Sequence, residues 1–290
     1  MKLLLSLLAT LLLAACAHVP AQSADTAPIR AMTFNIRLDV ASDGENAWPH
    51  REEMVEAVIK HEDPDLLGMQ EVLVHQKQYL EAALPGYTFV GVGRDDGAEA
   101  GEFSPLGWRK DRFAMVDSGT FWLSPTPEVA GSKGWDAALP RIATWAVLRD
   151  RRSGEMIRVL NTHFDHIGTV ARANAARLIA DWVASGPASD TPAIVMGDFN
   201  VTPGSEPYRV LADTAQSGLS DARTASRTPP YGPAGTFSGF DIMAAAEAPI
   251  DHIFVTDDFT VDSYAVVTQH WGGRLPSDHY PVVANVELRR

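Results

Sequence analysis

Short apolar runs alternate with amphipathic segments along most of the chain, a pattern that predicts strands interspersed with helices. Apolar runs that end at polar or turn residues predict strands over 29–36, 64–72, 87–92, 113–123, 142–150, 155–164, 193–197, 250–255, 260–269 and 281–288. Apolar residues three and four apart predict helices over 48–62, 75–84 and 170–184, with a short one near 205–212. Residues 93–103 and the stretch from 213 to about 248 are predicted to be loops.

The order of these elements favours an α/β fold. Each half of the chain mixes strand–helix–strand units with antiparallel hairpins, and many strands are apolar on both faces. Two sheets packed face to face, with helices outside both, would bury such strands. Periodicity alone leaves a doubly wound sheet open as the alternative.

The N-terminus has the pattern of an export signal. Lys2 precedes an apolar run over 3–15, which is too short to span a membrane. The sequence Leu13-Ala14-Ala15-Cys16 resembles the lipobox of bacterial lipoproteins, which implies cleavage before Cys16 and a lipid on its thiol. The alternative is an ordinary signal peptide with an incidental cysteine. We therefore expect a signal over 1–15, a tether over 16–28, one domain over 29–290, and an exported protein held at the outer membrane.

Charge limits the possible partners. The chain carries 24 basic and 37 acidic residues, a formal net charge of −13. An acidic surface repels polyanions, so strong sequence-independent binding to DNA or RNA is disfavoured. Phosphate chemistry is still compatible with this charge, because a carboxylate site can bind a divalent cation that reverses the local sign.

Polar side chains stand where the predicted strands begin or end. They are Asn35, Glu71, His163 with Asp165, Asp198 with Asn200, Asp251 with His252, and Asp278 with His279. Taken singly, each has a structural explanation such as a turn or a cap. Strand ends on one edge of a sheet converge on one cleft, so together they indicate a site. Asp198 and Asn200, two apart in an extended chain, would point the same way.

The ordered segments TFNIR (33–37), MQE (69–71), NTHFDH (161–166), GDFN (197–200), IDHIFV (250–255) and SDHYPV (277–282) resemble the endonuclease/exonuclease/phosphatase superfamily. The resemblance spans about residues 29 to 288. It implies a four-layer α/β/β/α sandwich of two packed mixed sheets with outer helices. It also implies hydrolysis of a phosphoester with Mg²⁺ or Mn²⁺ as cofactor.

The resemblance also implies residue roles. Glu71 would be the main metal ligand, with Asn35 and Asp278 completing or orienting its shell, because hard cations prefer oxygen ligands. Asp198 would position and deprotonate the attacking water, and Asn200 would donate to the phosphate. His279, held by Asp251, would contact the phosphoryl oxygen or act as an acid, and His163 would face the phosphate from another side.

Other candidate residues are less specific. Arg141 could clamp a phosphate or form a surface ion pair. Asp165 and His166 could read the substrate or support the residues that do. Trp48, Trp108 and Trp271 could stack on a ring of the substrate or pack in the core.

The sequence thus predicts a metal-dependent phosphoester hydrolase, either a phosphodiesterase or nuclease, or a phosphatase. Its substrate would be a nucleic acid, a sugar or inositol phosphate, or a lipid head group, and no protein partner is implied. The alternative is a catalytically silent envelope lipoprotein that binds phosphorylated ligands.

Overall fold

The computed structural model describes residues 27–244 and 247–289. Cys16 and the predicted signal peptide lie outside the described residues. Within the described part, no helix is both long and apolar enough to cross a membrane.

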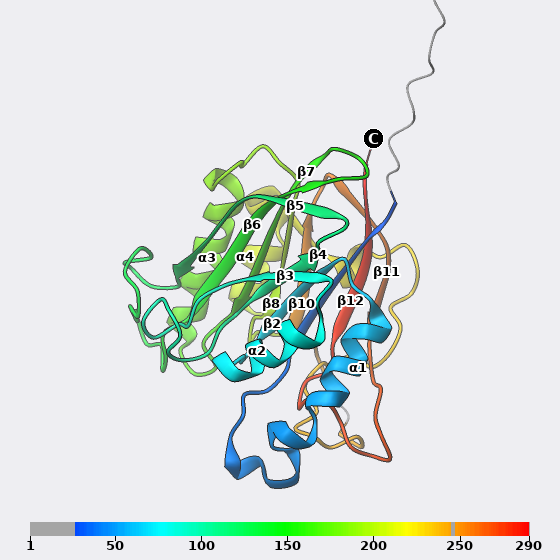
Figure 1. Cartoon of the computed structure of the whole chain (residues 1–290). Coiled ribbons are helices and arrows are strands. Elements are labelled where there is room, and N and C mark those ends of the chain that lie inside the picture. Colours follow the sequence, from blue (N-terminus) through cyan, green and yellow to red (C-terminus); the bar gives the residue numbers. More distant parts are fainter. Residues whose placement is uncertain (1–26, 245–246, 290) are drawn as a thin grey trace, which may run out of the picture.

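Two six-stranded mixed sheets form the centre of the molecule (Figure 1). The first has the order β11 (Phe259–Val266), β12 (Val282–Leu288), β1 (Ile29–Asn35), β2 (Leu66–Gln70), β4 (Leu106–Arg109) and β3 (Tyr87–Val90). The second has the order β5 (Phe113–Trp122), β6 (Ile142–Asp150), β7 (Met156–His163), β8 (Ala193–Asp198), β10 (Asp251–Thr256) and β9 (Leu219–Asp221). In each sheet one central pair is parallel, β1 with β2 and β7 with β8.

Helices cover the outer face of each sheet (Figure 1). Helices α1 (Glu52–Glu62) and α2 (Val74–Ala83) pack on the first sheet, after the 3₁₀ turns η1 (Ala41–Asn46) and η2 (Trp48–His50). Helices α3 (Thr169–Ser185) and α4 (Glu206–Ala212) pack on the second, and two short helices, α5 (Thr214–Ser217) and α6 (Ala222–Ala225), follow. The predicted four-layer sandwich is confirmed.

The two-residue period of the strands separates the core into layers. In β8, Ile194 and Met196 pack between the sheets, while Val195 packs on the helix side. The next position on the inter-sheet face is Asp198, and the same alternation places Asp251 of β10 on this face. The polar strand-end residues therefore continue the inter-sheet core to one edge of the sandwich.

Buried amides join the two sheets beside this edge. Gln70 Nε2 donates to Asn161 Oδ1 across the interface at 2.6 Å, and Asn161 Nδ2 donates to Met69 O at 2.7 Å. Glycine is required opposite them, because a Cβ on Gly68 would lie 2.6 Å from Asn161 Oδ1. This network fixes the spacing of the sheets close to the site.

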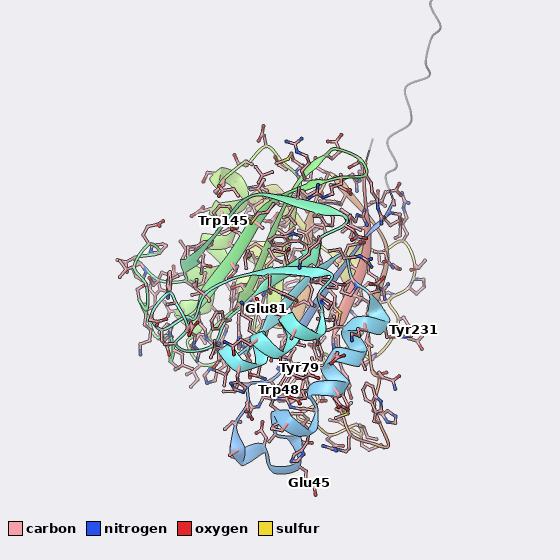
Figure 2. All side chains as sticks on the ribbon, viewed as in Figure 1. Glu45, Trp48, Tyr79, Glu81, Trp145 and Tyr231 are labelled. Carbon is pink, nitrogen blue, oxygen red and sulfur yellow. The ribbon has the colours of Figure 1, made fainter. Side chains whose placement is uncertain are left out.

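Two local predictions differ from the structure, and one open alternative is decided. The helix expected from residue 48 begins at Glu52, because Arg51 leaves helical geometry (φ −136°) and directs its buried guanidinium to loop carbonyls such as Pro276 O. Strands β4 and β9 were not predicted, since each is short and exists through pairing with distant strands. Trp48 and Trp108 are core residues; Trp48 meets Tyr79 edge-on at 5.8 Å (Figure 2).

Candidate active site

The polar strand ends meet at a cavity of about 510 Å³ between the two sheets. Eight of the residues predicted from the sequence line it: Glu71, Arg141, His163, His166, Asp198, Asn200, Asp278 and His279. Asn35, Asp251 and Asp165 are not in its lining and act on it through other side chains. The convergence expected from the strand ends is therefore observed.

Asp198 is the centre of this arrangement. Its Oδ1 accepts a hydrogen bond from Asn200 N at 2.9 Å, which closes a tight turn after β8. Its Oδ2 accepts from Asn35 Nδ2 at 3.0 Å and lies 3.4 Å from His163 Nε2 and 3.7 Å from His279 Nε2. Oδ1 of Asp198 therefore stabilises the turn, and Oδ2 contacts the polar side chains of the site.

Asn200 has a different geometry from the one predicted. Its backbone is left-handed (φ 50°), so the chain is not extended between Asp198 and Asn200. Its Nδ2 donates to Phe164 O at 3.1 Å and lies 3.2 Å from His163 Nε2. An amide nitrogen only donates, so Nε2 of His163 accepts this bond. Asn200 orients His163 instead of offering free hydrogens to a phosphate.

His279 is held by a buried carboxylate. Its Nδ1 lies 2.9 Å from Asp251 Oδ2, which leaves Nε2 directed to Asp198. Asp251 pairs with Asp198 across β10 and β8, so two carboxylates oppose each other directly. Asp251 Oδ1 is buried and has no partner among the described residues.

The two histidines differ in charge. Burial by itself lowers the pKa of His279, but the charges of Asp251 and Asp198 outweigh it and raise that pKa to about 10. Burial, together with the nearby charge of Arg141, holds the pKa of His163 well below its ordinary value. Burial and the charge of Asp251 raise the pKa of Asp198. His279 is therefore a cation, His163 is neutral, and Asp198 is a stronger base than an exposed aspartate.

A second group of carboxylates faces Asp198. Glu71 follows β2 in a left-handed conformation (φ 61°), a strained backbone of the kind that is frequent at functional sites. Arg37 Nη1 lies 3.7 Å from Glu71 Oε2, and Arg37 Nε lies 3.9 Å from Asp278 Oδ2, while both Nε and Nη2 of Arg37 donate to Asp43. Burial, and then the charge of Glu71, raises the pKa of Asp278. Arg37 therefore gives its short hydrogen bonds to Asp43 and only longer ion pairs to Glu71 and Asp278, whose oxygens fit a hard divalent cation.

Asn35 does not present an oxygen to this group. Its Nδ2 donates to Glu71 Oε1 and to Asp198 Oδ2, each at 3.0 Å, and its Oδ1 accepts from Arg37 N. Asn35 therefore orients two carboxylates, which is one of the two roles that the resemblance implies for it.

A different set could also hold a cation. Asp198, Asp251 and His279 offer ligand atoms that all lie within 4.8 Å of one another. Two of these atoms already pair with each other at 2.9 Å, so this set fits an acid–base relay better than a metal shell.

Arg141 closes the other end of the cavity. Its side chain is 5% exposed, and its Nε and Nη1 have no hydrogen-bond partner in the described part of the chain. Its Nη2 lies 3.0 Å from His166 Nδ1. A buried guanidinium with unused donors is ready to bind an anion or hydroxyl.

Asp165 supports this wall instead of contacting a ligand. Its oxygens accept backbone N–H groups from Ala138, Leu139, Ile167 and Gly168 at 2.7–3.2 Å. Burial by itself raises its pKa, but these hydrogen bonds outweigh burial and hold the pKa at about 2. Asp165 therefore fits the supporting role that was one of its two alternatives, and a substrate contact by His166 stays a prediction.

Sequence reasoning missed six residues of the lining, among them Glu102 and Phe237. Glu102, from the loop after β3, accepts from Arg94 Nη1 at 2.7 Å and lies 3.9 Å from His163 Nδ1. Phe237 is 47% exposed, and its ring centre lies 5.1 Å from that of His279. Neither lies in a periodic segment, although an acid in a glycine-rich loop was a signal for Glu102.

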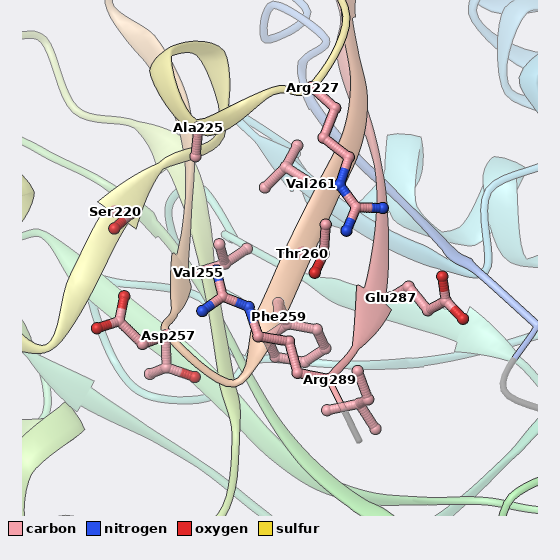
Figure 3. A pocket seen from close by; sticks show the side chains of 12 residues that line it. Ser220, Ala225, Arg227, Val255, Asp257, Phe259, Thr260, Val261, Glu287 and Arg289 are labelled. Atoms are coloured by element: carbon pink, nitrogen blue, oxygen red, sulfur yellow. The ribbon is translucent and has the colours of Figure 1, made fainter.

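Two other features lie outside the site. His252 points to the helix side of β10, where its Nδ1 lies 3.3 Å from Asp221 Oδ2. Figure 3 shows a second hollow, of about 630 Å³, whose lining includes Arg227, Phe259 and Arg289. The described residues that line it include no histidine, and Arg227 already pairs with Asp262. The polar side chains that line the inter-sheet cavity therefore make it the candidate active site.

Comparisons with known proteins agree with this geometry. Residues 32–279 match the family model described as Endonuclease/Exonuclease/phosphatase family. A search among curated proteins found no match.

Several solved structures are similar. An endonuclease/exonuclease/phosphatase from Bacteroides vulgatus is 41% identical, with a TM-score of 0.85, over 90% of this chain and 99% of that one. The mannosyl-6-phosphatase from Bacteroides thetaiotaomicron is 36% identical, with a TM-score of 0.83, over 89% and 99%. The catalytic domain of human Nocturnin is 21% identical over 91% and 94%, and its TM-score of 0.70 shows a shared fold.

Proposed function

The chain belongs to the Endonuclease/Exonuclease/phosphatase family and is a phosphoester hydrolase; from that premise we propose that it is a divalent-metal-dependent phosphatase of small-molecule monoesters. The observation that carries the proposal is the position of the buried Asp198. It lies between the cationic His279 and the neutral His163 and faces the carboxylates described above. These are the groups that hydrolysis of a phosphate by water requires.

Each residue of the site has a separate role in the proposed reaction. Asp198 Oδ2 takes the proton of the attacking water, and the cationic His279, held by Asp251, donates from Nε2 to a phosphoryl oxygen. Asn200 donates to Nε2 of the neutral His163 and so holds its ring beside Asp198. A hard divalent cation held by Glu71 and Asp278 would neutralise the phosphate charge and steady the leaving oxygen.

Three observations favour a monoester of a small molecule. The cavity of about 510 Å³ falls in the range of roughly 300–1,000 Å³ that is common for small-molecule sites. The net charge of −13 disfavours a polyanion. A protein 36% identical over nearly its whole length is a mannosyl-6-phosphatase.

The test compares p-nitrophenyl phosphate with bis-(p-nitrophenyl) phosphate, each with Mg²⁺, Mn²⁺ or EDTA. We expect turnover that EDTA abolishes and that is higher for the monoester. A preference for the diester would replace the phosphatase by a phosphodiesterase. No turnover of either, with phosphate still bound, would favour the silent binding lipoprotein.

We also propose that the protein is exported and held at a membrane by a lipid on Cys16. Strand β1 begins at Ile29 and delivers Asn35 to the site, so Ile29 lies at the end of the strand away from the cavity. This orientation favours soluble substrates over head groups of the same membrane. A Cys16→Ser protein that still partitions with membranes would contradict the anchor.

A further inference from the structure

We infer that Glu102, Arg141 and His166 form a subsite for the leaving group of the ester, and that this leaving group is polyhydroxylated, as a pyranose is. The inference rests on the proposed function and extends it from the phosphate to the molecule that carries the phosphate.

The imidazole ring of His163 separates the subsite from Asp198. His163 faces Asp198 with Nε2 at 3.4 Å and faces Glu102 Oε2 with Nδ1 at 3.9 Å. A phosphate beside Asp198 therefore places its ester substituent next to Glu102 and Arg141, which line the same cavity.

The donors and acceptors of this wall suit hydroxyl groups. A carboxylate accepts about four hydrogen bonds, and Arg94 supplies one to Glu102 at 2.7 Å. Nε and Nη1 of Arg141 have no hydrogen-bond partner among the described residues, with Asp165 Oδ2 3.6 Å from Nε, and His166 Nδ1 lies 3.0 Å from Nη2. Neighbouring hydroxyls of a sugar donate to a carboxylate and accept from a guanidinium at the same time.

The lining also contains apolar side chains. Leu139, Phe237 and Ile250 line the cavity, and Phe237 is 47% exposed. A pyranose has polar edges and faces of C–H groups, so it matches a cavity that is lined by both polar and apolar side chains.

Two other occupants fit less well. A second phosphate could bind Arg141 but would also meet the carboxylate of Glu102, which only Arg94 among the described residues neutralises, at 2.7 Å. A nucleobase held between rings would need a second large aromatic, and the described lining contains no tryptophan or tyrosine.

The experiment measures kcat/KM for mannose 6-phosphate and for p-nitrophenyl phosphate, whose leaving group has no vicinal hydroxyls. Glu102→Gln keeps the shape of the side chain and removes its charge. His166 is exposed, so we expect His166→Ala to fold. We expect the ratio of the two kcat/KM values to fall about 10- to 100-fold in Glu102→Gln, the size of losing a hydrogen bond to a charged group. A smaller fall in the same direction is expected in His166→Ala.

The matched control is Asp150→Asn. Asp150 is a buried carboxylate bound to Arg112 Nη2 at 3.2 Å, outside the cavity lining, so the ratio should stay unchanged. Wild-type turnover of p-nitrophenyl phosphate with an unchanged ratio in both subsite variants would overturn the subsite and leave the phosphatase intact. No turnover of either substrate by the wild type would overturn the proposed function together with the subsite.

Discussion

Asp251→Asn tests how the charge on His279 is maintained. The substitution keeps the size of the side chain and a possible hydrogen bond at Nδ1, which now lies 2.9 Å from Asp251 Oδ2. It removes the largest of the negative charges that offset burial, so the pKa of His279 should fall from about 10. A larger share of the imidazole would then be neutral at pH 7.5, and that share lacks the charge-assisted bond to the phosphoryl group.

The size of the effect follows from that bond. A hydrogen bond to a charged group contributes about 1.5–3 kcal/mol, which corresponds to a roughly 10- to 150-fold fall in kcat/KM. The assay is hydrolysis of p-nitrophenyl phosphate at pH 7.5, with NMR titration of the His279 imidazole to confirm the change of charge.

The chain contains its own control for this variant. Asp221 forms an equally buried pair with His252 at 3.3 Å, and neither residue lines the cavity. Asp221→Asn should lower stability and leave kcat/KM unchanged. An Asp251→Asn protein that is folded and retains kcat/KM within threefold of wild type would refute the reasoning.

Three further predictions concern the metal, the backbone and acid stability. Glu71→Gln should raise the Mg²⁺ concentration for half-maximal activity at least about tenfold, because a neutral amide binds a hard cation more weakly; an unchanged metal titration would move the site to the Asp198–Asp251–His279 group. Gly197→Ala should lower the free energy of unfolding by at least about 2 kcal/mol in a denaturant titration, since its Cβ would lie 2.1 Å from Thr162 O on the paired strand; a smaller loss would show that the strands can separate. Asp165 has a pKa lowered from 3.8 to about 2, so its contribution is present above pH 4 and is lost as pH falls through 2. Unfolding of the wild type across this window should show about 2 kcal/mol of pH dependence that Asp165→Asn lacks, and equal slopes would contradict the assignment.

The part of the site that could be predicted comes from strands. Apolar runs located the strands, and polar residues at their ends, such as Glu71, Asp198 and His279, mark where the inter-sheet face meets solvent. The same two-residue period explains why Asp251 belongs to the site, whereas its neighbour His252 points to the helices.

The part that could not be predicted depends on contacts between distant segments. Glu102 enters the cavity because Phe103 pairs with Val72, far away in the sequence, and no local pattern encodes that pairing. The orientation of the Asn35 amide and the backbone donors around Asp165 also depend on residues from other elements. Residue types at strand ends were therefore predictable, and the direction of each polar atom was not.

The central claim is that Asp198 activates water for attack on a phosphate. The most direct measurement is kcat/KM for p-nitrophenyl phosphate in Asp198→Asn, with circular dichroism and thermal unfolding to confirm the fold. The amide keeps the turn through Oδ1 and cannot take a proton, so kcat/KM should fall about 100- to 10,000-fold, the range for losing a general base. A folded Asp198→Asn protein with kcat/KM within tenfold of wild type would contradict the claim.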